Sequence, residues 1–184
     1  MRIIAGSLKG RRLKSPSWEG LRPTSDKLRE TLFNILAPRI AGARVLDGYA
    51  GTGAAGIEAL SRGAAAVTFV DRDRRAQELV EANLAHCGVR NGCVIIRATV
   101  ARALTSLRAA ESAFDIVLLD PPYEAPADAE LAAVADVLAP GGVVAVEHAR
   151  RTPMPDRVGP LVRSRDVRSG DSVLTFYARP HEAV

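Results

Sequence analysis

The chain has 184 residues, of which 47% are hydrophobic and 25% charged, a composition typical of one globular domain with a substantial core. Three scattered histidines and two cysteines without a CxxC pair argue against a metal site, so we expect no metal and expect Cys87 and Cys93 to be reduced structural thiols. No apolar run has the length of a signal sequence or a membrane span, which predicts a cytoplasmic protein without a membrane partner.

The positive charge is concentrated at the N-terminus. Residues 1–30 carry eight basic and three acidic side chains, whereas the net charge of the whole chain is +4. Such a local excess favours contact with the phosphate backbone of a nucleic acid, and a solvated basic tail is the alternative. The alternation from Arg2 to Leu13, broken by Gly6 and Gly10, predicts a hairpin that stays mobile until RNA binds.

A helix is predicted after this basic segment. Leu28, Leu32, Ile35 and Leu36 recur with the spacing of one apolar helix face. Trp18, which precedes the helix, suits stacking on an RNA base about as well as packing inside the protein.

A glycine-rich loop follows the first predicted buried strand, residues 44–47, which ends at Asp47. The loop consists of Gly48, Tyr49, Ala50, Gly51, Thr52 and Gly53, and a helical stretch begins after it. Glycines let the backbone approach a ligand closely, and the N-terminus of the helix lies just behind them. The pattern predicts a ligand-binding loop.

A second predicted strand, residues 66–70, ends in Asp71, whose carboxylate can accept both hydroxyls of a ribose. Gly51, Gly53 and Gly56 satisfy GxGxxG, which makes NAD one candidate ligand. However, three residues separate Asp47 from Gly51, and a carboxylate at the strand end suits a cationic amino acid moiety better than a pyrophosphate, which it would repel.

The next two elements continue the alternation of helices and strands. An apolar helical stripe over residues 76–87 is followed by Gly88, which is placed to end the helix. Residues 94–97 are predicted to form the third strand.

The turn Asp120, Pro121, Pro122 and Tyr123 follows the fourth predicted strand, residues 114–119. The prolines lack N–H donors and stiffen the turn, which leaves its carbonyl groups and the Asp120 carboxylate as a rigid set of acceptors. An exocyclic amine offers two N–H donors to such a set, and Tyr123 can stack on the ring that carries the amine. An ordinary proline turn at a strand end is the alternative.

The C-terminal third completes the sheet. Leu131, Val134, Ala135 and Leu138 predict a helix that stops at Pro140, Gly141 and Gly142. Residues 143–147 are predicted to be the fifth strand. At its end, Glu147 and His148 are expected to have structural roles, and lining the substrate cleft is the alternative. Residues 161–168 and 172–178 predict a closing hairpin. The whole pattern predicts a doubly wound α/β sheet with an antiparallel C-terminal edge.

Together, the glycine loop, Asp71 and the Asp120 turn resemble the class I methyltransferases that use S-adenosylmethionine, which have a Rossmann-like fold. The segments RIIAG, KGRRL, RPT and RETLFNIL within residues 2–36, with GIEALSRGA at 56–64, are similar to the RsmD family. That family methylates the 2-amino group of a guanine, position 966 in the customary numbering, in 16S ribosomal RNA. The resemblance implies a hairpin and helix extension over residues 1–38, part of the same unit as a methyltransferase domain over residues 39–184.

The resemblance also implies roles for individual residues. Asp47 would face the methionine amine and Asp71 the ribose, and further cofactor contacts are expected from Gly48, Tyr49, Ala50, Gly51, Gly53, Arg72, Thr99 and Val100. The catalytic residues would be Asp120, Pro121, Pro122 and Tyr123. The expected RNA contacts are Arg2, Lys9, Arg11, Arg12, Lys14, Arg22 and Thr24.

The chain departs from the family pattern in two places. Gly48 and Tyr49 stand where the family usually has an apolar pair such as Leu and Phe. The segment from Ala98 to Val100 replaces one that carries Asp or Asn beside the adenine, so the Thr99 hydroxyl or the Val100 amide is expected to take that part.

The expected partner is 16S ribosomal RNA in an assembled or assembling small subunit, bound by a monomer. Three alternatives stay open. An adenine-N6 methyltransferase acting on DNA or RNA would use the same turn, because both amines present the same donors. A noncatalytic assembly factor would use the basic arm alone, and an NAD-dependent oxidoreductase would use the glycine loop.

Overall fold

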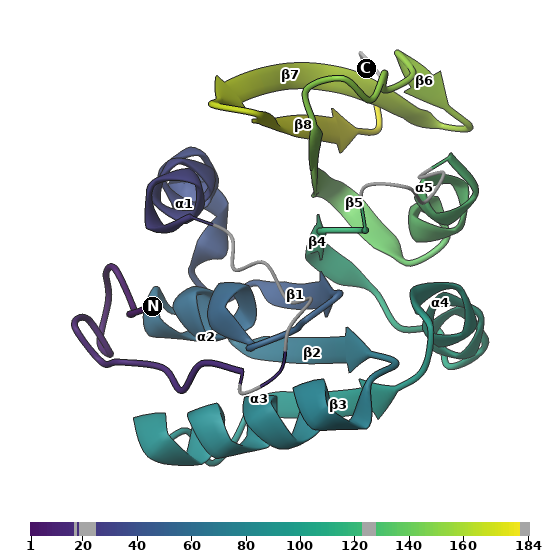
Figure 1. The fold of residues 1–184 in the computed structure, drawn as a ribbon. Coiled ribbons are helices and arrows are strands. Elements are labelled where there is room, and N and C mark those ends of the chain that lie inside the picture. Colours follow the sequence, from purple (N-terminus) through teal and green to yellow (C-terminus); the bar gives the residue numbers. More distant parts are fainter. Residues whose placement is uncertain (17, 19–24, 123–127, 181–184) are drawn as a thin grey trace.

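The computed structural model describes residues 1–16, 18, 25–122 and 128–180. Its strands are β1 (Arg44–Gly48), β2 (Ala66–Asp71), β3 (Cys93–Arg97), β4 (Phe114–Leu119), β5 (Leu138–Ala149), β6 (Arg157–Val158), β7 (Leu161–Ser169) and β8 (Ser172–Ala178). They form one sheet in the order β3-β2-β1-β4-β5-β8-β7-β6 (Figure 1). Strands β1 to β5 pair in parallel, whereas β8 is antiparallel to both β5 and β7.

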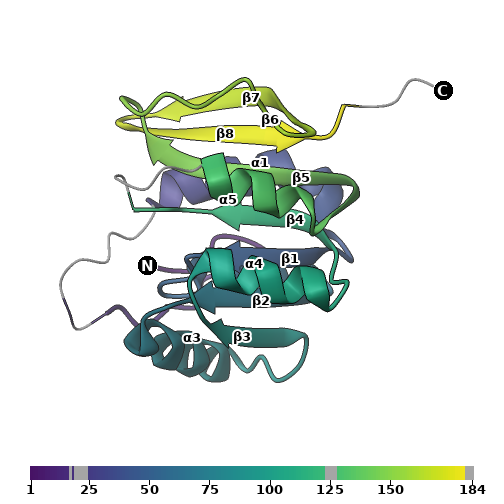
Figure 2. The same ribbon diagram turned by 90° about the vertical axis from the view of Figure 1, so that its right-hand side faces the viewer.

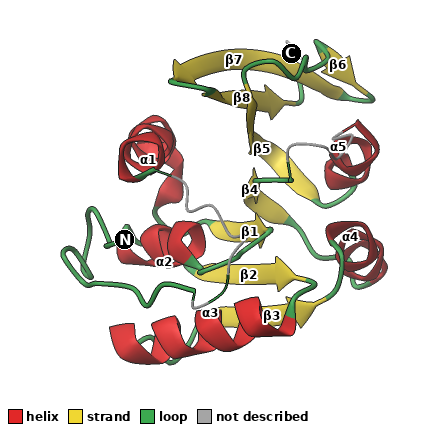
Figure 3. Cartoon of the chain, in the orientation of Figure 1, coloured by secondary structure: helices red, strands yellow, loops and turns green. Residues whose placement is uncertain are grey.

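Five helices cover the sheet in the described residues: α1 (Asp26–Ile40), α2 (Ala54–Ser61), α3 (Arg74–Cys87), α4 (Val100–Ala109) and α5 (Asp128–Ala135). Helices α1, α2 and α3 lie on one face, and α4 and α5 lie on the other (Figure 1). Figure 2 looks onto the face that α4 and α5 cover. Each face has its own apolar core, one centred on Phe33 and Phe69 and the other on Leu104 and Leu131. Figure 3 shows the alternation of helices and strands along the first five strands. The predicted doubly wound sheet with an antiparallel edge is confirmed.

Side chains cap the starts of α1 and α3. The Ser25 hydroxyl accepts a hydrogen bond from the Leu28 amide at 3.1 Å, and the Asp73 carboxylate accepts one from the Arg75 amide at 2.9 Å. Gly88 ends α3 in the left-handed conformation, as its position in the sequence predicts. Helix α1 continues through Pro38, so no structural break falls at the boundary expected between the N-terminal extension and the rest of the chain.

The prediction for the segment after α5 was wrong in one respect. The helix ends at Ala135, before Pro140 and the two glycines, and Leu138 already belongs to β5. The Phe114 amide donates to the Val137 carbonyl at 2.8 Å, and Phe114 pairs with Leu138 before the register shifts. Strand pairing at this point therefore overrides the helical spacing, and the Pro-Gly-Gly segment is accommodated as an irregularity within the strand.

The basic N-terminal arm, residues 1–16, is a single hairpin-like loop that packs on the core. One isolated bridge joins Arg2 to Arg12, and the Ile3 side chain is 1% exposed. The buried Glu58 carboxylate in α2 accepts hydrogen bonds from the amides of Ile4 at 2.7 Å and Ala5 at 3.0 Å. The expectation that the hairpin stays mobile until RNA binds was therefore wrong, because hydrogen bonds to a buried carboxylate fix the backbone of the arm.

Both cysteines are free thiols, as predicted: Cys87 ends α3 and Cys93 begins β3. Burial raises the pKa of both thiols, which favours their protonated form. Among the helices in the described ranges, none has both the length and the apolar character needed to cross a bilayer.

Candidate active site

Four acidic residues lie at the carboxyl ends of adjacent parallel strands: Asp47 in β1, Asp71 in β2, Asp120 after β4 and Glu147 in β5. The strand register brings these ends level, because Gly48 pairs with both Val70 and Leu119, and Leu119 pairs with Val146. Ligands of open α/β sheets bind at this edge. The fold thus gathers residues that are up to a hundred positions apart in the sequence.

The loop between β1 and α2 is shaped by backbone positions that favour glycine. Gly51 and Gly53 have positive φ angles of 53° and 77°. A Cβ atom at Gly48 would lie 2.9 Å from Leu119 Cδ2, and one at Gly56 would lie 2.2 Å from Phe69 Cε1. The first pair of glycines turns the chain, and the second pair allows close packing against β4 and β2.

Asp47 is buried at the base of this loop. Its Oδ2 atom accepts a hydrogen bond from the Gly56 amide at 2.8 Å, so it holds the first turn of α2. Burial raises the pKa of Asp47 to about 7, the Gly56 hydrogen bond opposes that rise, and the negative charge of Asp71 adds to it. A cation bound beside Asp47 would restore the charged form.

Asp71 ties the loop to β2. Its Oδ2 atom accepts from the Gly51 amide at 3.0 Å, and its Oδ1 atom accepts from the Asp73 amide at 2.9 Å. Each carboxylate oxygen has a second lone pair, so the same side chain can still accept from a bound hydroxyl group.

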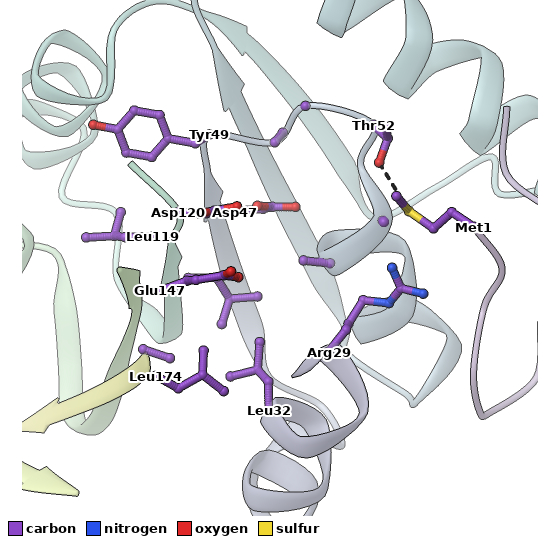
Figure 4. Close-up of a pocket in the computed structure, with 16 residues that line it drawn as sticks. Met1, Arg29, Leu32, Asp47, Tyr49, Thr52, Leu119, Asp120, Glu147 and Leu174 are labelled. Atoms are coloured by element: carbon purple, nitrogen blue, oxygen red, sulfur yellow. Dashed lines mark hydrogen bonds between the residues drawn. The ribbon is translucent and has the colours of Figure 1, made fainter. Parts of the chain in front are cut away.

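A pocket opens between the ends of β1, β4 and β5. Its lining includes Asp47, Asp120 and Glu147, together with Arg29 from α1 (Figure 4). Tyr49, Ala50 and Gly51 of the predicted cofactor set also line it. Asp120 and Pro122 are exposed and Pro121 is buried, whereas Tyr123 lies outside the described residues.

The residues predicted to contact adenine lie beyond this pocket. Thr99 is the N-cap of α4, where its hydroxyl accepts a hydrogen bond from the Arg102 amide at 3.3 Å. Val100 is buried, and its Cγ2 atom would lie 3.5 Å from a Cβ at Gly48. Arg72 is exposed after β2. Thr99, Val100, Arg72 and Asp71 are absent from the pocket lining, so the described cavity corresponds to one end of the predicted cofactor site.

Tyr49, one of the two departures from the family pattern, links the loop to α5. It has a positive φ angle of 82°, and its hydroxyl donates a hydrogen bond to Glu130 Oε2 at 2.5 Å. Burial, followed by the bond to Glu130, raises the pKa of Tyr49 above its ordinary value. The hydroxyl therefore stays protonated and serves as a donor.

Two charged pocket residues, Arg29 and Glu147, were not among the site residues predicted from the sequence. Glu147 lines the pocket, which was the alternative for this pair, whereas its neighbour His148 is buried and forms a hydrogen bond with Thr175 Oγ1 at 2.8 Å, as a structural role requires. Arg29 belongs to the RETLFNIL segment, which by itself assigns it no role. The sequence signal that could have identified Arg29 was its position four residues before Phe33, because this spacing places a charged side chain on the buried face of α1.

The described part of the basic arm exposes its charges. Arg2, Lys9, Arg11, Arg12 and Lys14 are all exposed, whereas Arg22 and Thr24 lie outside the described residues. The Arg75 guanidinium carbon lies 5.0 Å from the centre of the Trp18 ring, a cation–π distance.

The family model described as "Conserved hypothetical protein 95" matches residues 1–178. The Escherichia coli K12 "Ribosomal RNA small subunit methyltransferase D" is 44% identical over 123 residues, 67% of this chain and 60% of that protein. The chain belongs to the RsmD family. The Bacillus subtilis "Putative rRNA methyltransferase YlbH" is 38% identical over 182 residues, 97% of this chain and 99% of that protein.

A solved structure has the same fold. It is described as "Putative methyltransferase yhhF from Escherichia coli" and superposes with a TM-score of 0.82 at 35% identity, covering 97% of each chain. The shared fold therefore includes the N-terminal arm, α1 and the antiparallel edge as well as the parallel core. The predicted family and fold class are both confirmed.

Proposed function

We propose that this RsmD-family protein transfers a methyl group from S-adenosylmethionine to the exocyclic 2-amino group of a guanine in 16S ribosomal RNA, at position 966 in the customary numbering. The observation that carries the proposal is the convergence of Asp47, Asp71 and Asp120 with the glycine loop at one edge of the sheet, in a chain of this family. S-adenosylmethionine is the cofactor expected of this family.

The residues present fit that cofactor. Gly51 and Gly53 turn the loop with positive φ angles that strain other residues, and Gly48 packs closely against Leu119. Side chains at these positions would therefore disturb the loop that faces the ligand. The Asp47 carboxylate suits the ammonium group of the methionine moiety, and Asp71 suits the ribose hydroxyls. The Thr99 hydroxyl, whose proton is still available to donate, or the Val100 amide at the first turn of α4 would meet the adenine. Arg72 would supply a further cofactor contact.

When bound, the cofactor supplies an electrophilic methyl group on a sulfonium centre. The work of the chain is to present the amine. The Asp120 carboxylate and the Pro121 carbonyl would accept hydrogen bonds from the two N–H groups of a flipped-out guanine, which aims the nitrogen lone pair at the methyl group. Pro122 holds the turn rigid, and Tyr123 would stack on the base. The proton released after transfer goes to Asp120 or to water.

The arm would hold the RNA backbone. The exposed charges of Arg2, Lys9, Arg11, Arg12 and Lys14 supply phosphate contacts, and Arg22 and Thr24 extend the same segment. The proposed substrate is the RNA of an assembled or assembling small subunit, bound by one protein monomer without a metal. A cytoplasmic location follows from this substrate.

The test is to incubate the protein with labelled S-adenosylmethionine and, in parallel, naked ribosomal RNA, assembled small subunits and DNA, followed by mass spectrometry of the nucleosides and mapping of the modified position. We expect N2-methylguanosine at a single site of the ribosomal RNA. N6-methyladenosine would instead identify an adenine methyltransferase. RNA binding without methyl transfer would indicate an assembly factor, and NAD binding without response to S-adenosylmethionine an oxidoreductase.

A further inference from the structure

Arg29 places an incompletely paired positive charge in the wall of the pocket. Its side chain is 1% exposed, and its Nη2 atom donates to the Arg2 carbonyl at 2.5 Å and to Asp26 Oδ1 at 3.0 Å. Its Nε and Nη1 atoms are buried and have no hydrogen-bond partner among the described residues. Buried donors are rarely left without an acceptor, because the loss of hydration is costly.

The nearest buried acid does not satisfy these donors. Glu58 Oε2 lies 4.0 Å from Arg29 Nε, beyond hydrogen-bond distance. The Glu58 oxygens already accept from the Ile4 and Ala5 amides and from Arg62 Nε at 2.7 Å. Burial lowers the pKa of Arg29, but guanidinium starts so high that the side chain remains a cation.

The surroundings of Arg29 favour an anion. Ala54 and Ala55, the first residues of α2, line the same pocket, and the first amides of a helix have no acceptor within the helix. Figure 4 shows Arg29 on the side of the pocket where Met1 and Thr52 lie. Among the pocket-lining residues that the structure describes, Arg29 is the only cationic side chain, whereas Asp47, Asp120 and Glu147 are acidic.

A ligand that carries an ammonium group and a carboxylate on one carbon matches this charge pattern. We infer that Arg29 binds the carboxylate of the methionine moiety of S-adenosylmethionine, with the Ala54 and Ala55 amides as additional donors, while Asp47 binds the ammonium group. The bound carboxylate supplies the acceptor that Nη1 lacks. This inference rests on the proposed cofactor and does not depend on which base is methylated.

Isothermal titration calorimetry with S-adenosylmethionine and with decarboxylated S-adenosylmethionine isolates the carboxylate. The wild-type protein is expected to bind the intact cofactor about 10-fold or more tightly than the decarboxylated one, the value of a charge-assisted hydrogen bond. In Arg29→Met the ratio of the two dissociation constants should fall close to one. Arg62→Met is the matched control, because Arg62 also pairs with Glu58 but does not line the pocket, and it should keep the wild-type ratio.

Circular dichroism will show whether Arg29→Met folds. If it does not fold, Arg29→Lys and the wild-type protein still test the inference. Arg29→Lys retains a cation and should give a ratio between those of the wild type and Arg29→Met. Equal binding of both ligands by the wild-type protein overturns the inference without any variant, as does an unchanged ratio in folded Arg29→Met. Methylation of a different base would refute the proposed substrate and leave the ratio untouched.

Discussion

Aspartate side chains have different roles on the two sides of the candidate active site. At the ends of β1 and β2, Asp47 and Asp71 accept hydrogen bonds from backbone amides and so hold the glycine loop and the start of α2. At the end of β4, Asp120 is exposed, and the two residues that follow it are prolines, which have no amide hydrogen to donate. A carboxylate at a strand end therefore shapes the backbone on one side and faces the pocket mouth on the other.

This difference predicts separable effects. Substitutions on the β1 and β2 side should alter cofactor affinity and folding stability together, because the carboxylates there contact both the loop and the proposed ligand. Substitutions at Asp120 should alter turnover far more than cofactor affinity. Both expectations can be tested with isosteric or truncating changes of single residues.

Asp120→Ala should give the largest effect. Removing the acceptor of the amine is expected to lower single-turnover methyl transfer to small subunits by about 100-fold or more, while the affinity for S-adenosylmethionine measured by calorimetry stays within about 2-fold of the wild type. Asp115→Ala is the matched control, since Asp115 lies at the opposite end of β4 and pairs with Arg44 at 3.4 Å on the surface. Wild-type turnover in Asp120→Ala would remove this residue from the mechanism.

Asp47→Asn should lower cofactor affinity by about 10-fold and abolish its dependence on pH. The pKa of Asp47 is raised to about 7 in the protein without ligand, so much of the side chain is protonated below that pH. The cationic amine requires the carboxylate, and wild-type affinity should therefore rise as pH increases through about 7. Calorimetry at a series of pH values checks the profile, and a wild-type profile that matches the variant would separate Asp47 from the amine.

Asp47→Asn should also change how folding stability depends on pH. The folded-state pKa of Asp47 lies above its ordinary value, so the stabilising contribution of its protonated form is present at low pH and disappears as pH rises through about 7. Asparagine does not titrate, and thermal unfolding without cofactor should show Asp47→Asn gaining stability relative to the wild type between about pH 5 and pH 8. A constant difference in stability between the variant and the wild type over that interval would mean that burial does not raise the pKa of Asp47.

The acidic strand ends could be predicted because their signals are local. A short apolar run followed by Asp47, Asp71 or Asp120 marks the end of a buried strand. Glycine after Asp47 and proline after Asp120 also mark a turn. Parallel packing then brings such ends to one edge whatever their separation in sequence. The correct bounds of β4 and the placement of the glycine loop both follow from this pattern.

Features that depend on pairing between distant residues were not predictable in the same way. The early start of β5 at Leu138 depends on its partner Phe114, and the anchoring of the arm depends on Glu58, which lies 54 positions from Ile4. The role inferred for Arg29 needs the position of α1 relative to the pocket. In each case the local spacing was compatible with another structure, and the tertiary contact decided the outcome.

Substitutions in the basic N-terminal arm are expected to have a smaller effect, and that effect should be on RNA binding. Replacing Arg11 and Arg12 with glutamine should raise the dissociation constant for ribosomal RNA several-fold and reduce the slope of its logarithm against salt by about 0.7 to 0.9 for each phosphate that the arm no longer neutralises. Arg165→Gln with Arg168→Gln is the control, because both side chains are exposed on β7, near the other edge of the sheet. Fluorescence anisotropy at several salt concentrations checks this. Equal effects in both pairs would indicate a nonspecific contribution of net charge.

Tyr49→Phe should have the smallest effect and tests whether the two sides are coupled, since the Tyr49 hydroxyl joins the cofactor loop to α5 through Glu130. Removal of one partly buried hydrogen bond is expected to lower the free energy of unfolding by about 1 kcal/mol, and Glu130 can regain water. The loop itself is held by Val70 and Asp71, so cofactor affinity should change by less than about 2-fold.

Tyr177→Phe, which removes a hydrogen bond to the Pro155 carbonyl at 2.7 Å, is the control for stability in urea unfolding. A large decrease of affinity in Tyr49→Phe alone would show that α5 helps to set the loop.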